Sequence, residues 1–118
     1  MSPIDFIRSR RSIRRYEKKD IPSDILDKII EAGRQAPSAA NRQPRRFIII
    51  TDYKIKKELS KGGSFNRFLK DSPLVIVGCA NPKDLLTGKW ASIDAAISLQ
   101  NGSCCMGSRR WFLLDRRF

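Results

Sequence analysis

The stretch Ala36–Pro44, APSAANRQP, decides how the rest of the chain is organised. Pro37 ends the helical pattern before it, and the small and polar residues that follow are typical of a loop. The side chains of Asn41 and Gln43 offer both hydrogen-bond donors and acceptors. This combination suits a flat ring with alternating donors and acceptors, such as the pyrimidine of a flavin. Taken alone, the stretch is more simply interpreted as a connection between a helix and a strand.

Regular elements are expected on both sides of this loop. A helix begins at residues 21–23, and its apolar residues recur with helical spacing. The run Phe47–Ile50 is apolar without a helical period, which predicts a buried strand. A second buried strand is expected in residues 74–80, LVIVGCA. The residues expected on the apolar face of the helix are Ile25, Leu26, Ile29, Ile30 and Ala36.

Three further helices complete the pattern. A short N-terminal helix is capped by Ser2 and begins at Pro3. A second, amphipathic helix is expected over residues 53–60 and a third over residues 90–101. The order helix, helix, strand, helix, strand, helix contains no repeat and no linker, so it predicts a single domain. The residues expected to make apolar contacts are Ile4, Phe6 and Ile7 in the first helix and Ile93, Ala96 and Ile97, aligned with Gln100, in the last.

The composition excludes several classes of protein. The 118 residues are 41% hydrophobic, which is enough for a globular domain with a modest core. No apolar run approaches the roughly 20 residues of a membrane helix, and no signal-like segment follows the basic N-terminus, so a cytoplasmic protein is expected. The chain has three cysteines and no histidine. A disulfide framework, most zinc sites and histidine-dependent triads are therefore not expected, and we assign no catalytic residue and no metal ligand.

A second notable stretch is basic: Arg10-Arg11-Ser12-Ile13-Arg14, RRSIR. The whole chain carries 24 Lys and Arg against 12 Asp and Glu, a net charge of +12. Guanidinium groups match phosphate oxygens and a serine hydroxyl adds a neutral donor, so the cluster indicates a phosphate site. The same basic run also fits a nucleic-acid-binding patch. Against that alternative, the run lacks interleaved aromatic residues apart from Tyr16, and no recognised nucleic-acid-binding motif is present.

In this order and spacing, the two stretches resemble the nitroreductase family. The matching features are an N-terminal helix, RRSIR, a helix that ends in APSAANRQP, an aliphatic strand and the helix SIDAAISLQN. The resemblance covers about residues 3–101. It implies an α+β fold with a mixed sheet flanked by helices, whose C-terminal part is missing from this chain.

The resemblance also implies an FMN-dependent oxidoreductase that binds its cofactor at the interface of a homodimer. The residues carried over to the FMN phosphate and ribityl chain are Arg10, Arg11, Ser12 and Arg14. Those carried over to the isoalloxazine ring, from the other subunit, are Pro37, Ser38, Ala39, Asn41 and Gln43. Arg45 follows Pro44 where the family often has an aromatic residue, so the edge of the ring is expected to be more open and more cationic.

The implied mechanism is ping-pong hydride transfer. A reduced nicotinamide, NADH or NADPH, gives a hydride to the flavin and leaves, and a nitroaromatic, quinone or similar small molecule then takes the electrons. Two alternatives stay open: a small basic nucleic-acid-binding protein, and a folded but inactive fragment of a nitroreductase. Flavin absorbance of the purified protein would separate the oxidoreductase from both.

The tail, residues 102–118, does not follow the family pattern. A shifted reading frame is the expected cause, with a genuine, divergent C-terminus as the alternative. If the codons after Asn101 are read one base later, Met106 must become Trp and Trp111 must become Gly, both where the family has these residues. Residues 1–101 are then the family-like part of a single domain and 102–118 an aberrant tail, in which Cys104 and Cys105 have no ligand role.

Overall fold

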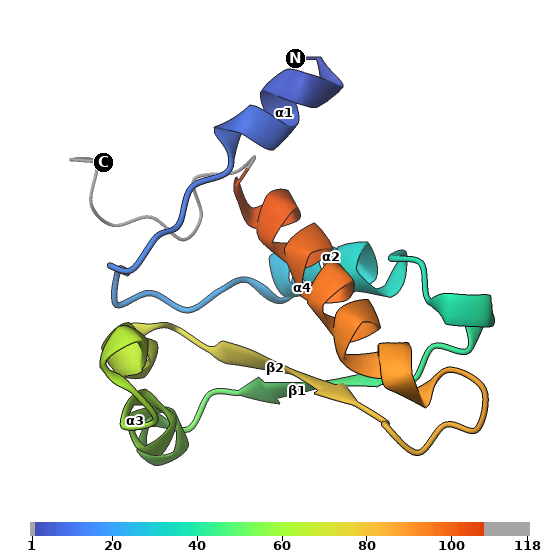
Figure 1. Ribbon diagram of the computed structural model, residues 1–118. Helices are drawn as coiled ribbons and strands as arrows, with labels where there is room; N and C mark the ends of the chain where they lie inside the picture. The colour runs from blue at the N-terminus through green and yellow to red at the C-terminus, as the bar shows by residue number, and fades with distance from the viewer. Residues whose placement is uncertain (1, 108–118) are drawn as a thin grey trace.

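The computed structural model describes residues 2–107, in which two strands pair and helices pack beside them (Figure 1). The helices and strands follow the predicted order. Three 3-10 helices, labelled η, are additions that a sequence pattern does not reveal, because short 3-10 segments carry little hydrophobic period. The elements are α1 (Pro3–Ser9), α2 (Ser23–Arg34), η1 (Ala39–Asn41), β1 (Arg45–Ile50), α3 (Tyr53–Ser60), η2 (Ser64–Asp71), β2 (Val75–Ala80), η3 (Gly88–Trp90) and α4 (Ala91–Gly107).

The sheet is antiparallel and two-stranded within the described residues. Arg45 pairs with Ala80 at one end, and Ile50 pairs with Val75 at the other. Helix α4 crosses the sheet in Figure 1. Gly78 allows this crossing, because a Cβ at that position would lie 2.9 Å from Cδ1 of Leu99. The parallel pairing that a mixed sheet requires is not among these two strands.

Helix α2 packs against α4 through small residues. A Cβ on Gly33 would lie 3.3 Å from the carbonyl oxygen of Ser98, and one on Gly102 would lie 3.4 Å from Cγ2 of Ile29. The side chain of Asn101 donates to the carbonyl of Ala32 over 3.2 Å. The two helices therefore approach closely, and the predicted apolar face of α2 supplies the buried core residues Ile25 and Ile29.

The predicted end of the last helix at Asn101 is wrong, since α4 continues to Gly107. Gly102 is buried, and the absence of a side chain there lets the added turns lie on α2. Glycine is a poor helix former on its own, so this tertiary contact overrides the local signal. Residues 108–118, which hold most of the predicted aberrant tail, lie outside the described residues.

Several apolar side chains that we expected to be buried are exposed instead. Ile48 and Ile49 of β1 are 51% and 42% exposed. Neighbouring residues of a strand point to opposite faces, so one face of the sheet is left open and the helices cover the other only in part. In α4, Ile93 is 49% exposed and Ile97 37% exposed, while the small residues of that helix face the protein. Helix α1 buries no residue. Among the described residues, no helix is both long and apolar enough to cross a bilayer.

The contact between α2 and α4 predicts a strong contrast between two isoleucines. Ile29→Ala removes a side chain that is 4% exposed, and the resulting cavity should lower the free energy of unfolding by about 2–4 kcal/mol. Ile93→Ala, on the exposed face of α4, should change it by less than about 1 kcal/mol. Urea denaturation at a protein concentration low enough to prevent self-association measures both values. Equal losses would show that the core does not lie between these two helices.

Candidate functional site

The segment Ala36–Pro44, which we name the amide loop, has an unusual backbone. Ala40, Asn41 and Gln43 have positive φ angles of 49°, 52° and 53°. Residues other than glycine seldom adopt this left-handed conformation, and each instance costs on the order of 1–3 kcal/mol unless the surroundings enforce it. Three such residues within four positions therefore require strong anchoring, and strain of this kind concentrates at binding sites.

Hydrogen bonds within the amide loop bring three of the predicted ring-binding residues together. The amide nitrogen of Gln43 donates to Oγ of Ser38 over 3.0 Å. The side-chain nitrogen of Gln43 donates to Oδ1 of Asn41 over 3.1 Å. Asn41 and Gln43 are exposed, whereas Ser38 and Ala39 are half-buried and Pro37 is exposed beside them. The amide loop therefore exposes the side chains of Asn41 and Gln43 to solvent, and the hydrogen bond to Ser38 constrains the backbone that carries them.

The segment after β2 anchors the outer side of the amide loop. Arg42 donates to both carboxylate oxygens of Asp84, over 3.0 and 3.4 Å. Thr87, which is buried, donates its amide and its hydroxyl to the same carboxylate. The hydrogen bond from Arg42, followed by that from Thr87, lowers the pKa of Asp84 to about 2. The backbone amide of Asn81 also donates to the carbonyl of Pro44 over 2.8 Å.

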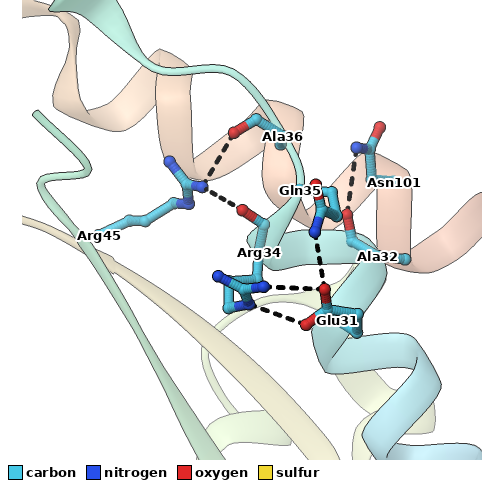
Figure 2. A network of polar contacts seen from close by, with 7 residues as sticks. All are labelled: Glu31, Ala32, Arg34, Gln35, Ala36, Arg45 and Asn101. Atoms are coloured by element: carbon cyan, nitrogen blue, oxygen red, sulfur yellow. Dashed lines mark hydrogen bonds and ion pairs between the residues drawn. The ribbon is translucent and has the colours of Figure 1, made fainter. Parts of the chain in front are cut away.

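The expectation that Arg45 makes the ring edge more cationic is wrong. The residue is only 7% exposed, and its Nη2 donates to the carbonyls of Arg34 and Ala36, over 3.0 and 2.9 Å (Figure 2). Carbonyls at the C-terminal end of a helix lack partners within the helix and attract cations. Arg45 therefore binds the end of α2, where its charge is directed into the protein.

A second, exposed network holds the same end of α2 (Figure 2). Glu31 accepts two hydrogen bonds from Arg34, over 2.8 and 2.9 Å, and one from the side chain of Gln35, over 2.7 Å. These contacts lower the pKa of Glu31 to about 2, with the Arg34 hydrogen bond as the largest cause. Because the pair is solvent-exposed, it orders the last turn more than it stabilises the fold.

The basic stretch after α1 is extended and has no regular structure. Arg10 donates to Oγ of Ser12 over 3.3 Å, so these two predicted phosphate-binding residues lie together. Arg11 turns away from them, because its Nη1 donates to the carbonyls of Arg8 and Arg10 over 2.6 and 2.8 Å. Within the described residues, Arg10, Arg11 and Arg14 form no ion pair with a carboxylate. Their charges therefore remain available for an anion.

Arg14 faces a different environment from Arg10. It lies beside Tyr16, whose pKa is raised by burial and partly lowered by the Arg14 charge. The hydroxyl of Tyr16 donates to the carbonyl of Ile13 over 2.9 Å, which fixes this part of the stretch. Both side chains line an open groove of about 1110 Å³, together with Lys56 and Lys70. Arg14 thus lines a groove, and the structure gives no contact between it and Arg10 or Ser12.

The two halves of the predicted site do not meet in one chain. Figure 1 places the stretch after α1 on one side of the molecule and η1, within the amide loop, on the other. No hydrogen bond or ion pair of the described residues joins them. If both halves bind one ligand, a second copy of the chain has to bring them together.

Comparison with known proteins identifies the class that this arrangement defines. The model of the nitroreductase family matches residues 7–71. The chain is 39% identical over 80 residues to an Archaeoglobus fulgidus protein provisionally named NADH dehydrogenase/NAD(P)H nitroreductase, which covers 68% of this chain and 46% of the relative. It is 32% identical over 78 residues to the FMN reductase [NAD(P)H] of Bacillus subtilis, covering 66% of this chain and 31% of that protein.

A solved structure agrees with the sequence comparisons. The FMN-dependent nitroreductase of Clostridium difficile R20291 superposes with a TM-score of 0.77 at 34% identity, covering 89% of this chain and 60% of the other. The α+β fold is therefore that of these enzymes, and the chain belongs to the nitroreductase family. It spans about half the length of the first curated relatives, 53% and 46%.

Sequence reasoning missed the residues that anchor the amide loop. Asp84 and Asp94 lie 40 or more positions from the loop residues that they hold, and Thr87 acts on the loop only through Asp84. No local pattern marks these three residues. Asp94 gave the only available signal, since an acidic residue in a helix that is otherwise small and apolar needs a partner. The pairing itself depends on tertiary structure.

The ion pair of Arg42 and Asp84 predicts how the amide loop responds to acid. The pKa of Asp84 is lowered from its ordinary value near 3.9 to about 2, so the folded state favours the carboxylate. The stabilisation that this ion pair gives to the folded state is fully present above about pH 5 and is lost as the pH falls toward 2. The carboxyl carbon of Asp84, followed by NMR, should titrate with a midpoint near 2. In the Arg42→Met variant the midpoint should rise toward 3.9, and a midpoint near 4 in the unaltered chain would contradict the pairing.

Proposed function

We propose that this chain is the FMN-binding part of an NAD(P)H-dependent oxidoreductase. The observation that carries the proposal is the amide loop: exposed Asn41 and Gln43 side chains stand on a left-handed backbone held by hydrogen bonds. The pyrimidine edge of a flavin alternates carbonyl acceptors with an N–H donor, and amide side chains can match both. Half-buried Ser38 and Ala39 leave room for a ring close to the backbone.

The basic stretch fits the other end of FMN. Arg10 and Ser12 lie within hydrogen-bonding distance of each other and would hold the phosphate together, since both donate. Arg14 would add charge from the groove side, and Arg11 would contribute less because it caps the end of α1. The combination of a basic stretch with an amide-rich loop favours a mononucleotide, because the sequence has no glycine-rich turn for a pyrophosphate.

Bound FMN would supply the redox chemistry, taking a hydride from a reduced nicotinamide and passing electrons to a small acceptor in a ping-pong sequence. The residues of this chain would bind and orient the flavin. Neither half of the site contains a buried acid or base that would have to move a proton. The cationic surroundings would favour negative charge on the reduced ring. A nitroaromatic or a quinone is the class of acceptor that we propose.

A homodimer would bring the two halves of the site together. Exposed apolar side chains at the start of α4 and just before it support this arrangement. Trp90 of η3 is 46% exposed, and Ile93 and Ile97 of α4 are 49% and 37% exposed. Contiguous apolar surface of this kind marks an interaction site. The amide loop of one copy would then approach the basic stretch of the other, since the two segments lie on opposite sides of a single chain (Figure 1).

The names of the relatives agree with the proposal. One is an FMN reductase that uses NAD(P)H, and one solved neighbour is an FMN-dependent nitroreductase. Use of a reduced nicotinamide also favours a cytoplasmic site of action, where those nucleotides are regenerated. The inactive-fragment alternative stays open because the chain covers about half of its curated relatives.

Removal of one phosphate-binding charge should separate two flavins. Arg10→Ala should weaken FMN binding by about ten- to a hundred-fold, because a charge-assisted contact contributes roughly 1.5–3 kcal/mol. Riboflavin, which lacks the phosphate, should bind the variant as well as it binds the unaltered protein. Fluorescence titration measures both, with Lys57→Ala on the exposed side of α3 as the control. Equal losses for FMN and riboflavin would place Arg10 away from the phosphate.

Disruption of the exposed face of α4 should separate the copies. Ile93→Glu places a charge in the proposed interface, and it should give a monomer by sedimentation and lower FMN affinity at least about ten-fold. Ser92→Glu, on the neighbouring exposed position of the same helix, is the matched control. A monomeric unaltered chain that holds stoichiometric FMN would contradict the proposed dimeric site.

A further inference from the structure

Two buried side chains of opposite charge flank the amide loop. Arg45 is 7% exposed and Asp94 is 5% exposed. Within residues 2–107, neither forms an ion pair with the other or with any other residue. Burying an ionised group is costly unless hydrogen bonds compensate it. Each side chain makes a hydrogen bond to the backbone of the amide loop, and Arg45 makes a second one to the end of α2.

Arg45 fixes the entrance to the amide loop. Its Nη2 donates to the carbonyl of Arg34, in the last turn of α2, and to the carbonyl of Ala36, the first loop residue (Figure 2). Its Nη1 is buried and has no partner among the described residues. A buried nitrogen without a hydrogen-bond partner is rare and costly. The two hydrogen bonds to the end of α2 therefore determine where this side chain lies.

Asp94 fixes the middle of the amide loop from the other side. Its Oδ2 accepts from the amide nitrogen of Ala39 over 3.3 Å, across 55 positions of sequence. The carboxylate also lies in the first turn of α4, where the helix dipole favours a negative charge. Ala39 immediately precedes the left-handed residues Ala40 and Asn41. The contact is therefore placed where the strain begins.

We propose that Arg45 and Asp94 are positioning residues that together hold the amide loop in its left-handed conformation. Arg45, which directly follows the loop, ties its far end to Ala36, and Asp94 holds Ala39. The left-handed residues therefore lie between two fixed points, Ala39 and Arg45, and have little freedom to relax. The strained conformation persists because the surroundings enforce it, as such conformations require. The consequence for a flavin ring rests on the proposed function, whereas the positioning of the loop does not.

A positioning role differs from a general structural role in what it predicts. Met is an adaptable apolar side chain that can occupy the space of the Arg45 stem, and it removes the buried, unpartnered Nη1 together with the two donated hydrogen bonds. Arg45→Met should therefore keep the fold while it releases the loop. Asp94→Asn keeps the shape and an acceptor oxygen but removes the charge, and Arg45→Lys keeps a cation that can reach one carbonyl. These two conservative variants should be intermediate in effect.

Hydrogen exchange of individual amides tests the proposal without any ligand. In Arg45→Met and Asp94→Ala, the amides of Ala39 and Gln43 should exchange roughly ten-fold faster or more, while amides of the β1–β2 ladder change by less than about two-fold. The matched control is Arg46→Met, the exposed neighbour of Arg45. Equal acceleration of loop and ladder amides, or unchanged loop amides, would overturn the proposal.

Flavin binding supplies a second, separable readout. The same variants should weaken FMN and riboflavin by a similar factor, about ten-fold, because the loop faces the ring and not the phosphate. This pattern is the opposite of that expected for Arg10→Ala, which spares riboflavin. If the unaltered chain binds no flavin, the proposed function fails, and the exchange rates still decide whether Arg45 and Asp94 hold the loop. Variants that lose FMN while keeping riboflavin would refute the assignment to the ring side.

Discussion

The close approach of α2 to α4 is the contact on which the rest of the structure depends. Gly33 and Gly102 leave out the side chains that would otherwise separate the helices, and Ser98 is 1% exposed between them. This contact places the end of α2 and the beginning of α4 on either side of the amide loop. The hydrogen bonds of Arg45 and Asp94 to that loop are possible only because both helices are held there.

Much of the fold could be predicted from the sequence, because periodicity and capping are local properties. Ser2 caps α1 as expected, with Asp5 completing a reciprocal pair of hydrogen bonds. The spacing of Ile25 and Ile29 gave the buried face of α2 correctly. The exposure of β1 could not be predicted, since it depends on how many layers of structure cover the strand. The residue at which α4 ends could not be predicted either, because Gly102 allows the helix to continue through its contact with α2.

The candidate site shows the same division between local and distant information. The chemistry of its residues could be predicted from the sequence, because amide and guanidinium groups each form characteristic hydrogen bonds. The direction in which a long side chain points could not be predicted. Arg45 and Arg11 both turn toward helix-end carbonyls, and that choice depends on where unpaired acceptors lie in space. The separation of the two halves within one chain likewise appears only in three dimensions.

The uncovered sheet has a consequence for handling the protein. Ile48 and Ile49 are exposed on a strand whose outer edge has no neighbour among the described residues, which is the kind of surface that templates aggregation. Exposed Arg46 and Asp52 stand at the two ends of this apolar run and act as gatekeepers. The net charge of +12 adds repulsion between molecules, and salt shortens its range. Precipitation of the isolated chain should therefore be governed by ionic strength, with dilute buffers keeping it dispersed.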